Sequence, residues 1–379
     1  MTTGTPMPLP KLLFYTHGLV DGGAERLWAC LATAFKQRGY DVTFVQDFEA
    51  DDNRANLDPS IPLITLGPNH SRATWRLSKL LAELKPAIAL SAIGSCNTKL
   101  LLALAHSRAP TKAVITYHGY NEWKTGWLSW LAYIGLPLLS RFASRTVAVS
   151  TGLREELIRR WGARDDKVVT IHNPVFFPAQ AAVPTSDELR AREPVVLAVG
   201  RFVAEKDFVT LIRAFARLKT RGARLVILGK GPHQALLEGE VRRHGLTGRV
   251  AMPGYSREPW KYYAAARCFA LSSVSEPFGN VVVEAMAYGL PVVATACPGP
   301  LEILKYGRFG RIVPLKDDVQ LAQALDKALA DPGDPAVQRA RADDFSFAVR
   351  VPAYEKLIEE IINAPLPLAD AVTGTVASK

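Results

Sequence analysis

The sequence predicts an α/β protein with two doubly wound domains that face each other across a cleft. Short apolar, β-branched runs alternate with amphipathic stretches along most of the chain, which is typical of βαβ units on parallel sheets. The alternation breaks over 175–193, a segment rich in Pro and Ala that we interpret as a linker, and then restarts. The length of 379 residues also exceeds that of one ordinary compact core.

The elements of the first half follow from this alternation. Each expected strand is a short β-branched run, and each expected helix repeats its apolar residues with the helical period. The predicted strands are 12–16, 42–45, 88–91, 113–117, 146–149 and 168–171, and the clearest predicted helices are 24–38 and 75–84.

The second half repeats the pattern and ends in an amphipathic helix over 351–363. The predicted strands are 195–199, 224–228, 250–252, 268–271 and 292–295, and the predicted helices are 207–219, 232–244 and about 280–288.

Composition narrows the class of protein. The net charge is +10, and residues 1–180 hold 20 Lys and Arg against 14 Asp and Glu. A basic surface favours an anionic partner, although a merely soluble basic protein explains it as well. The four scattered cysteines contain no C-x-x-C pair, so we predict neither a disulfide framework nor a zinc site and expect a cytoplasmic location. The N-terminus has no apolar run and predicts no signal peptide.

The expected site lies between the domains, because parallel α/β sheets bind ligands outside the carboxyl ends of their strands. Two long loops follow strands of the first half, HGLVDGGAER (17–26) and HGYNEWKTGW (118–127). His118 begins the second loop. A lone histidine is more often structural than catalytic, but a strand end at a cleft favours a role in the site.

The stretch SEPFGNVVVEAMAYGLPVVAT (275–295) is the most informative. Gly279 or Asn280 can cap a helix whose first-turn amides favour an anion. Glu276 precedes this helix and Glu284 lies one turn in, so both can face the cleft. Carboxylates beside an anion site suit sugar hydroxyls, which predicts a ligand with phosphate and polyol parts, such as a nucleotide-sugar. The alternative is solvated capping acids on an ordinary buried helix.

Two cations begin the second half. Arg201 and Lys206 lie on the loop between a strand and a helix, where they can neutralise a diphosphate or are simply surface bases. The G-x-G of LGKGPHQALLE (228–238) lacks a third glycine and is weak as a dinucleotide motif. Asp51, Asp52 and Asn53 could suggest a metal site. No third ligand is evident, so we interpret this segment as a solvated loop and predict no metal site.

Residues 121–145 combine tryptophan with basic residues. Four residues recur on one face of a helix: Trp123, Trp127, Trp130 and Ile134. Such a helix suits a membrane interface or the core of the first domain, and both interpretations stay open. The apolar run is too short to span a bilayer.

Together these motifs resemble the retaining glycosyltransferases of family 4, which have the two-domain GT-B architecture. The resemblance covers roughly residues 11–363. The acids of 275–295 resemble the E-x7-E signature, and GRFVAEKD resembles the diphosphate-binding loop. GGAER (22–26) resembles the glycine-rich donor loop, and TYHG (116–119) resembles the segment whose His reaches the donor sugar. VAVSTGLREEL and TIHNPV also match in place.

This resemblance implies two Rossmann-like domains. Residues 1–178 would bind the acceptor and 179–350 the nucleotide-sugar donor. Residues 351–379 would form a helix and tail, with the helix packing back toward the first domain.

The resemblance also implies residue roles. Arg201 and Lys206 would hold the donor diphosphate, Glu284 would accept from the ribose and Glu276 from the transferred sugar, and His118 would bond to that sugar. The backbone would support sugar and diphosphate at two places, before the predicted helix and in the glycine loop: Phe278, Gly279 and Asn280, with Gly22 and Gly23. This chain has Gly119 where the family often has an acid, and Asn280 where many relatives have an aliphatic residue.

The implied reaction transfers a hexose or N-acetylhexosamine from a nucleoside-diphosphate sugar, UDP- or GDP-linked, with retention and without cofactor or metal. The protein would position the reactants and stabilise the leaving diphosphate. ACPGPLEIL (296–304) resembles a subgroup that acts on lipid-linked or polysaccharide acceptors. This favours a glycan or polyprenyl-diphosphate-linked acceptor and peripheral contact with the anionic inner face of the cell membrane.

Other functions are compatible with parts of the sequence. A sugar phosphorylase or a hydrolysing epimerase shares the GT-B fold and is the nearest alternative. A nicotinamide-dependent oxidoreductase would need G-x-G-x-x-G followed by an acid, which the sequence lacks. A nucleic-acid-binding protein would need clustered basic residues, and here they are spread out, so we expect no nucleic-acid partner.

Overall fold

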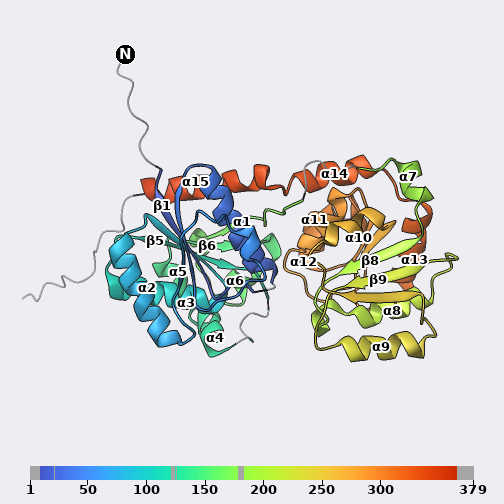
Figure 1. Cartoon of the computed structure of the whole chain (residues 1–379), viewed down its shortest axis with the longest axis horizontal. Helices are drawn as coiled ribbons and strands as arrows, with labels where there is room; N and C mark the ends of the chain where they lie inside the picture. The colour runs from blue at the N-terminus through green and yellow to red at the C-terminus, as the bar shows by residue number, and fades with distance from the viewer. Residues whose placement is uncertain (1–8, 21, 121–123, 125, 178–182, 365–379) are drawn as a thin grey trace, which may run out of the picture.

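The computed structural model describes residues 9–20, 22–120, 124, 126–177 and 183–364. Two parallel sheets, each covered by helices, form two lobes that lie side by side (Figure 1). The chain crosses between the lobes twice, once after β7 and again near the C-terminal end, where α14 and α15 run along one edge of both lobes (Figure 1). This architecture confirms the predicted pair of doubly wound domains.

The first domain has a seven-stranded parallel sheet in the order β3-β2-β1-β4-β5-β6-β7. Its strands are β1 (Lys11–Thr16), β2 (Asp41–Gln46), β3 (Leu63–Thr65), β4 (Ile88–Ala92), β5 (Lys112–Tyr117), β6 (Arg145–Ala148) and β7 (Val168–Thr170). Its helices are α1 (Gly23–Gln37), α2 (His70–Leu84), α3 (Gly94–Ser107), α4 (Trp127–Ile134), α5 (Leu136–Phe142) and α6 (Thr151–Arg159).

The second domain has a six-stranded parallel sheet in the order β10-β9-β8-β11-β12-β13. Its strands are β8 (Val195–Val199), β9 (Arg224–Leu228), β10 (Val250–Gly254), β11 (Cys268–Leu271), β12 (Val292–Thr295) and β13 (Arg311–Val313). The helices of this half are α7 (Ser186–Ala191), α8 (Phe208–Ala216), α9 (Gln234–Arg243), α10 (Pro259–Ala265), α11 (Asn280–Ala287), α12 (Pro298–Ile303), α13 (Asp318–Ala330), α14 (Pro335–Asp343) and α15 (Phe347–Asn363).

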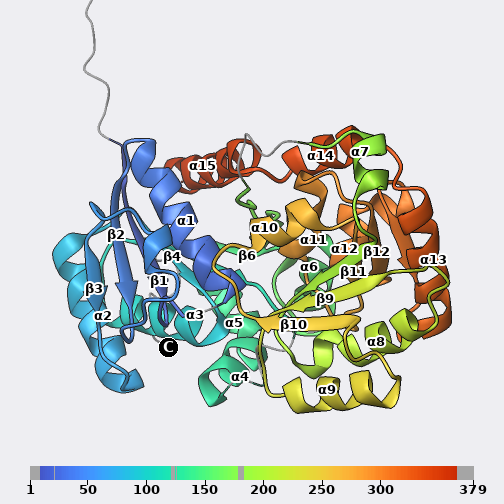
Figure 2. The ribbon, with the colours of Figure 1, turned by 45° about the vertical axis from the view of Figure 1, so that its right-hand side comes forward.

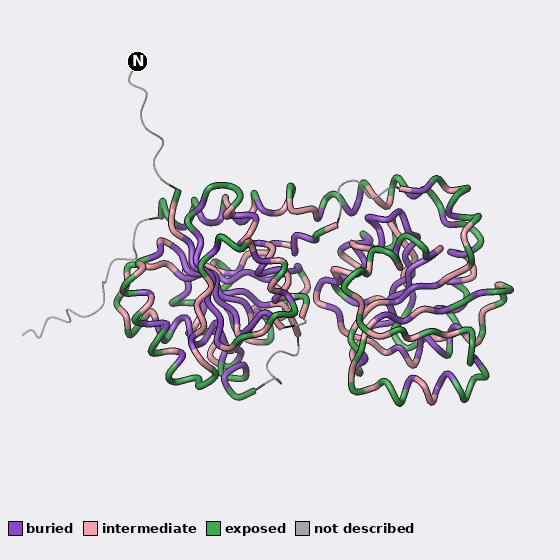
Figure 3. The backbone as a smooth tube through the Cα atoms, viewed as in Figure 1, coloured by how far each residue is buried: buried purple, intermediate pink, exposed green. Residues whose placement is uncertain are grey.

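The sheets form the buried centre of each lobe, and the outer faces of the helices are exposed (Figure 3). In β1, residues 12–16 are all buried, as expected for a strand covered by helices on both faces. The Phe14 ring packs edge-on against Trp28 of α1 at 5.7 Å. The continuous apolar runs in the sequence therefore correspond to strands in the core.

The C-terminal helix α15 packs on the first domain, as predicted. Its apolar residues belong to the same buried cluster as residues of β1, β2 and α1. Two polar contacts support this packing. Lys112 donates to the Ile361 carbonyl over 2.5 Å, and Arg38 pairs with Glu355 at 3.3 Å.

The structure differs from the predicted elements at several places. The segment interpreted as a linker contains α7, which begins with a capping box between Thr185 and Glu188. The short strands β3 and β13 were not predicted. The predicted Trp helix is two helices, because the chain turns at Gly135 and Pro137 lies in the first turn of α5. Trp123 and the predicted boundary at 178 lie outside the described residues.

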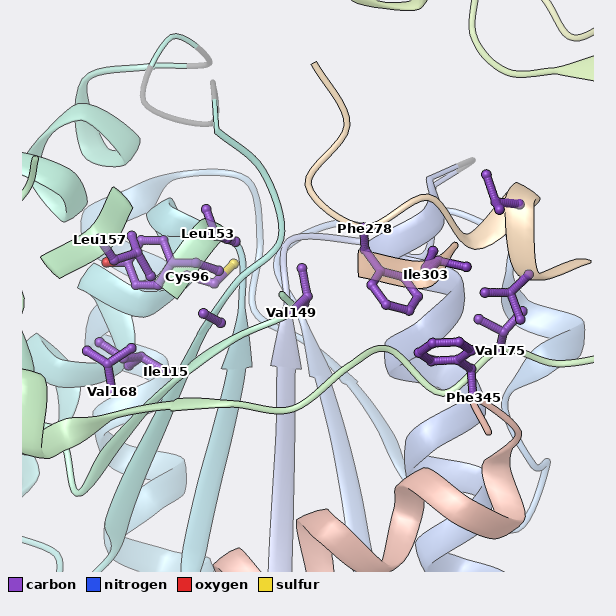
Figure 4. Packing of buried hydrophobic residues seen from close by; sticks show 14 of the residues in the cluster. Cys96, Ile115, Val149, Leu153, Leu157, Val168, Val175, Phe278, Ile303 and Phe345 are labelled. Carbon is purple, nitrogen blue, oxygen red and sulfur yellow. The ribbon is translucent and has the colours of Figure 1, made fainter. Parts of the chain in front are cut away.

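An aromatic seam joins the two lobes. Phe278 of the second domain lies 5.5 Å from Phe345, which precedes α15, and Val175 of the crossing segment lies close to Phe345 (Figure 4). His172, on the same segment, stacks on Phe278 at 5.7 Å. These contacts fix the loop before α11 relative to the first domain.

Candidate active site

A cleft with a cavity volume of about 1250 Å³ lies between the domains, which face each other across it (Figure 2). The structure brings every predicted site residue to its lining: Gly22, Gly23, His118, Arg201, Lys206, Glu276, Phe278, Gly279, Asn280 and Glu284. They come from the loops that follow β1, β5 and β8, from the start of α1, and from α11 and the loop that precedes it. The predicted residues alone therefore bring two carboxylates, two cations and two helix N-termini to one site.

The N-terminus of α11 is built around Gly279. This residue is the N-cap and has a φ of +101°, a left-handed conformation that favours glycine. The next helix packs tightly against the same loop, since a Cβ on Gly299 would lie 2.2 Å from the carbonyl oxygen of Phe278. The loop is therefore held with the first-turn amides of α11 at the cleft, where they can bind an anion.

Glu276 pairs with Lys206. The Lys206 ammonium lies 2.5 Å from Glu276 Oε2, and Ser273 Oγ donates to the same oxygen over 3.3 Å. Asp207 directly follows Lys206 and caps α8, accepting from the Thr210 amide at 3.4 Å and from the Thr210 hydroxyl at 2.7 Å. Lys206 therefore lies next to the start of α8 and forms its ion pair with Glu276 in the lining of the cleft.

Arg201 is exposed and lines the cleft directly after β8. Its loop packs on the G-x-G segment, where a Cβ on Gly229 would lie 2.0 Å from the carbonyl oxygen of Gly200. The weak dinucleotide motif is thus a packing feature that allows two loops to touch. The same packing brings Lys230 to the cleft, with its ammonium over the Tyr255 ring at 5.4 Å.

Glu284 is held from both domains. Tyr263 donates to Glu284 Oε2 over 2.8 Å, and Arg26 of α1 lies 3.6 Å from Oε1. Burial and the nearby carboxylate raise the pKa of Tyr263, so its hydroxyl stays a donor. Arg26 is the last residue of the predicted glycine loop GGAER. No role was predicted for it, because nothing in the sequence pairs it with a residue of the other domain.

His118 is neutral at physiological pH. Burial lowers its pKa to about 4, because a charged imidazolium is disfavoured away from water. Its Nε2 lies 3.0 Å from Thr116 Oγ1, and its ring meets Trp28 edge-on at 5.7 Å. Burial also lowers the pKa of His17, with a further contribution from Lys99. His17 and His118 are therefore suited to hydrogen bonding as neutral rings.

The glycine loop starts α1, with Gly22 as N-cap and Gly23 as first residue. Asn53 is buried and donates through Nδ2 to the carbonyl of Val20 over 2.5 Å. The interpretation of 51–53 as a solvated loop is therefore wrong for Asn53, whose side chain supports the glycine loop. A polar side chain at a loop position gave no sign of this role in the sequence.

A buried ion pair that the sequence analysis missed also lines the cleft. Lys99 of α3 contacts Asp47, which directly follows β2, and Tyr15 donates to Asp47 over 2.7 Å. Lys99 is 1% exposed. The position of Asp47 after a strand was the available signal, because such residues collect at the cleft.

An apolar surface lies beside the cleft on α4 and α5. Its exposed residues define what we call the α4–α5 face: Trp127, Trp130, Leu131, Ile134, Leu138 and Phe142. The opposite side of α4 packs into the domain through Leu128 and Tyr133. The interpretation of this tryptophan stripe as core is therefore wrong for Trp127 and Trp130, which are 63% and 46% exposed.

The described part of the chain shows neither a metal-binding cluster nor a membrane-spanning helix. No group of three or more His, Cys, Asp and Glu residues there is placed to hold a metal ion. None of the helices found there has the length and apolar character needed to cross a membrane.

Comparison with known proteins agrees with this geometry. Residues 21–176 match the family model "Glycosyltransferase Family 4", and residues 183–344 match "Glycosyl transferases group 1". The lipopolysaccharide core biosynthesis glycosyltransferase LpsE of Rhizobium meliloti (strain 1021) is 30% identical over 336 residues, which cover 82% of this chain and 86% of LpsE.

Two further relatives are informative. The N-acetylgalactosamine-N,N'-diacetylbacillosaminyl-diphospho-undecaprenol 4-alpha-N-acetylgalactosaminyltransferase of Campylobacter jejuni is 31% identical over 199 residues, which cover 52% of this chain and 53% of that enzyme. Anabaena HepE, solved with UDP and glucose, superposes with a TM-score of 0.78 at 21% identity and covers 93% of this chain and 98% of its own.

The fold is thus that of the GT-B class of glycosyltransferases, with the candidate site between two Rossmann-like domains. The chain belongs to glycosyltransferase family 4. The protein is accordingly an enzyme of the hexosyltransferase type.

Proposed function

We propose that the protein transfers a hexose or N-acetylhexosamine from a UDP- or GDP-sugar, with retained anomeric configuration, to a lipid-linked or polysaccharide acceptor. The observation that carries this proposal is the gathering of Arg201, Lys206, Glu276 and Glu284 around the N-terminus of α11 in one interdomain cleft. Cations and helix amides suit a diphosphate, and carboxylates suit hydroxyl groups.

On binding, the donor would take the place of the ion-pair partners that the charged side chains have in the free cleft. Lys206 turns from Glu276 to the diphosphate, together with Arg201, and this frees the carboxylate for hydroxyls of the transferred sugar. Glu284, beside Arg26 and Tyr263, accepts from the ribose. The gain is electrostatic, because charge on the leaving diphosphate increases as the glycosidic bond breaks. We propose no metal, since the two cations take this role.

The acceptor hydroxyl would attack from the side of the first domain. Its proton passes to the departing diphosphate, and the protein holds the two reactants in place. His118, neutral in the cleft, acts as a hydrogen-bond partner of the sugar. The glycine loop at Gly22 and Gly23 lets the backbone approach the diphosphate closely.

The names of the relatives support the class of acceptor. LpsE acts in lipopolysaccharide core biosynthesis, and the Campylobacter enzyme is named for a diphospho-undecaprenol-linked acceptor. We therefore propose a role in the synthesis of lipopolysaccharide or another surface polysaccharide.

A donor assay tests the reaction. We would incubate the protein with UDP-, GDP- and ADP-sugars and a polyprenyl-diphosphate-linked glycan and follow the release of nucleoside diphosphate. NMR would then determine the anomeric configuration of the product. We expect nucleoside diphosphate and a product with the anomeric configuration of the donor. Sugar 1-phosphate formed with inorganic phosphate would instead indicate a phosphorylase, and an epimerised free sugar would indicate a hydrolysing epimerase.

The α4–α5 face supports peripheral membrane contact. Exposed tryptophan with nearby basic residues favours the membrane interface, and Arg141 is exposed within α5. Trp127 belongs both to this face and to the cleft lining, so a face bound to the membrane would bring the cleft to a lipid-linked acceptor.

Vesicle binding tests the membrane contact. The variant Trp130→Ser/Phe142→Ser should co-sediment at least about tenfold less with vesicles of anionic phospholipid than wild type does, because two apolar side chains leave the interface. Trp75→Ser is the matched control, since Trp75 is 50% exposed on α2 outside the α4–α5 face. Equal binding of wild type and the double variant would contradict the proposed contact.

A further inference from the structure

A pair of side-chain amides joins the two domains in the middle of the cleft. Asn173 lies just after β7, where the chain begins to cross to the second domain, and Asn280 is the first residue of α11. Asn173 Nδ2 donates to Asn280 Oδ1 over 3.0 Å, and both residues line the cleft. Neither residue caps the helix, because Gly279 is the N-cap.

The hydrogen bond gives the Asn280 amide a direction. Its oxygen faces Asn173, while its Nδ2 faces the first domain and lies 3.8 Å from the position that a Cβ on Gly23 would take. Gly23 is the first residue of α1. The amide nitrogen is therefore located between two helix N-termini, beside the backbone groups to which we assign the sugar and diphosphate.

Asn173 has an acceptor that no residue of the described chain satisfies. Asn173 is only 6% exposed, and its buried Oδ1 has no hydrogen-bond partner among the described residues. Buried polar atoms nearly always have a partner, so this oxygen is suited to accept a hydrogen bond from a ligand.

We propose that this amide pair reads one hydroxyl of the transferred sugar, with Asn280 Nδ2 donating to it and Asn173 Oδ1 accepting from it. A hydroxyl is both donor and acceptor, so it satisfies both amides at once. The inference rests on the proposed function, because it requires the sugar of a nucleotide-sugar at this place. An aliphatic residue at 280 would fill space here without distinguishing a hydroxyl from hydrogen.

Coupling between protein and donor variants tests this assignment. We would measure kcat/KM and Kd for wild type and Asn280→Leu with the preferred donor from the UDP-, GDP- and ADP-sugar panel, its mono-deoxy analogues and its nucleoside diphosphate. We expect Asn280→Leu to weaken binding of the intact sugar donor about tenfold, as for the loss of one buried hydrogen bond. Binding of the nucleoside diphosphate should stay unchanged. At one deoxy position the variant and wild type should become nearly equal, because the read hydroxyl is missing.

Two controls separate this role from a structural one. Asn173→Ala should lose its difference from wild type with the same deoxy analogue as Asn280→Leu does. The reason is that Asn173 orients Asn280 and contacts the same hydroxyl. Asn363→Leu, at the exposed end of α15, should leave all donors unaffected. A merely structural tie between the domains would weaken sugar donor, deoxy donors and nucleoside diphosphate equally, and that result would overturn the assignment. Loss of all nucleotide-sugar binding in wild type would instead overturn the proposed function together with it.

Discussion

Each signature carboxylate of the cleft has a cationic partner in the free protein. Glu276 pairs with Lys206 at 2.5 Å and Glu284 with Arg26 at 3.6 Å. A carboxylate within the cleft is costly without such a partner. Under the proposed function, donor binding would therefore replace contacts between protein side chains with contacts to the ligand.

The neutral state of His118 predicts how the free energy of unfolding depends on pH. Its pKa is about 4 in the folded protein, below the ordinary value of about 6.5, so the unfolded chain binds the proton more readily. The free energy of unfolding should therefore fall as pH is lowered from about 6.5 toward 4. His118→Gln should lose less stability than wild type over this range in urea unfolding.

A histidine elsewhere supplies the control for this measurement. His106 is exposed near the end of α3, and His106→Gln should keep the wild-type dependence on pH. An identical pH dependence for His118→Gln and wild type would show that His118 is not buried in its neutral form.

Single residues show where sequence information ends. The motifs predicted Arg201, Lys206, Glu276 and the other lining residues, because strand ends and helix starts collect at one edge of a sheet. Arg26 and Asn173 were missed as site residues, since their partners belong to the other domain and no local pattern encodes a contact across the cleft.

At the scale of elements, the start of α11 depends on one glycine. Gly279→Ala places a Cβ on a residue with φ of +101° and 3.3 Å from Glu276 Cγ, so we expect a loss of about 1 kcal/mol or more. Donor binding should weaken as well, because the first-turn amides shift. Thermal unfolding and nucleotide titration would measure both effects.

The matched substitution is Gly239→Ala. Gly239 lies within α9, and an added Cβ meets nothing within 4 Å, so this variant should gain about 0.5–1 kcal/mol. Stability of Gly279→Ala equal to or above that of wild type would contradict the conformational role of Gly279.

Most strands could be predicted from their apolar runs, and two short edge strands could not. The central strands are apolar on both faces and were found almost at their observed limits, whereas the edge strands β3 and β13 have three residues each and mostly half-buried patterns. Helix α7 was missed because a Pro- and Ala-rich composition suggested a linker, although its capping box is visible in the sequence. The exposed tryptophans of α4 share their spacing with a core helix, so only the structure distinguishes the two faces.

At the scale of the molecule, Glu302 of α12 ties the domains together. It accepts from the Thr151 amide at 2.9 Å and the Thr151 hydroxyl at 2.6 Å, and it lies 2.6 Å from His172 Nε2. Burial acts against the charged form, but hydrogen bonds from His172 and Thr151 lower the pKa of Glu302. The second domain therefore meets the N-terminus of α6 through a carboxylate, which suits that helix end.

Glu302→Ala should loosen this contact. We expect faster hydrogen exchange at the Thr151 amide and a loss of about 1–3 kcal/mol, as for hydrogen bonds to a charged group. Glu258→Ala is the control, because Glu258 is exposed and pairs with Lys261 of α10, the helix that it directly precedes. Unchanged exchange at Thr151 would show that the domains do not depend on this tie.

The overall architecture was predictable because strands and helices alternate along the chain and one change of composition separates two domains. The family motifs then indicated a GT-B enzyme. The relative placement of the domains was not, since it depends on contacts such as Phe278 with Phe345 and Glu302 with His172. These residues are far apart in the chain, and their spacing carries no periodic signal.

Turnover of Lys206→Ala tests the central claim most directly. With the preferred donor of the nucleotide-sugar panel, we expect diphosphate release to fall about hundredfold or more, as when a charge-stabilising group is removed, while circular dichroism stays that of wild type. Lys219→Ala, exposed beyond α8, should retain full turnover. Unchanged turnover in a folded Lys206→Ala protein would contradict the assignment of this cleft to a nucleotide-sugar diphosphate.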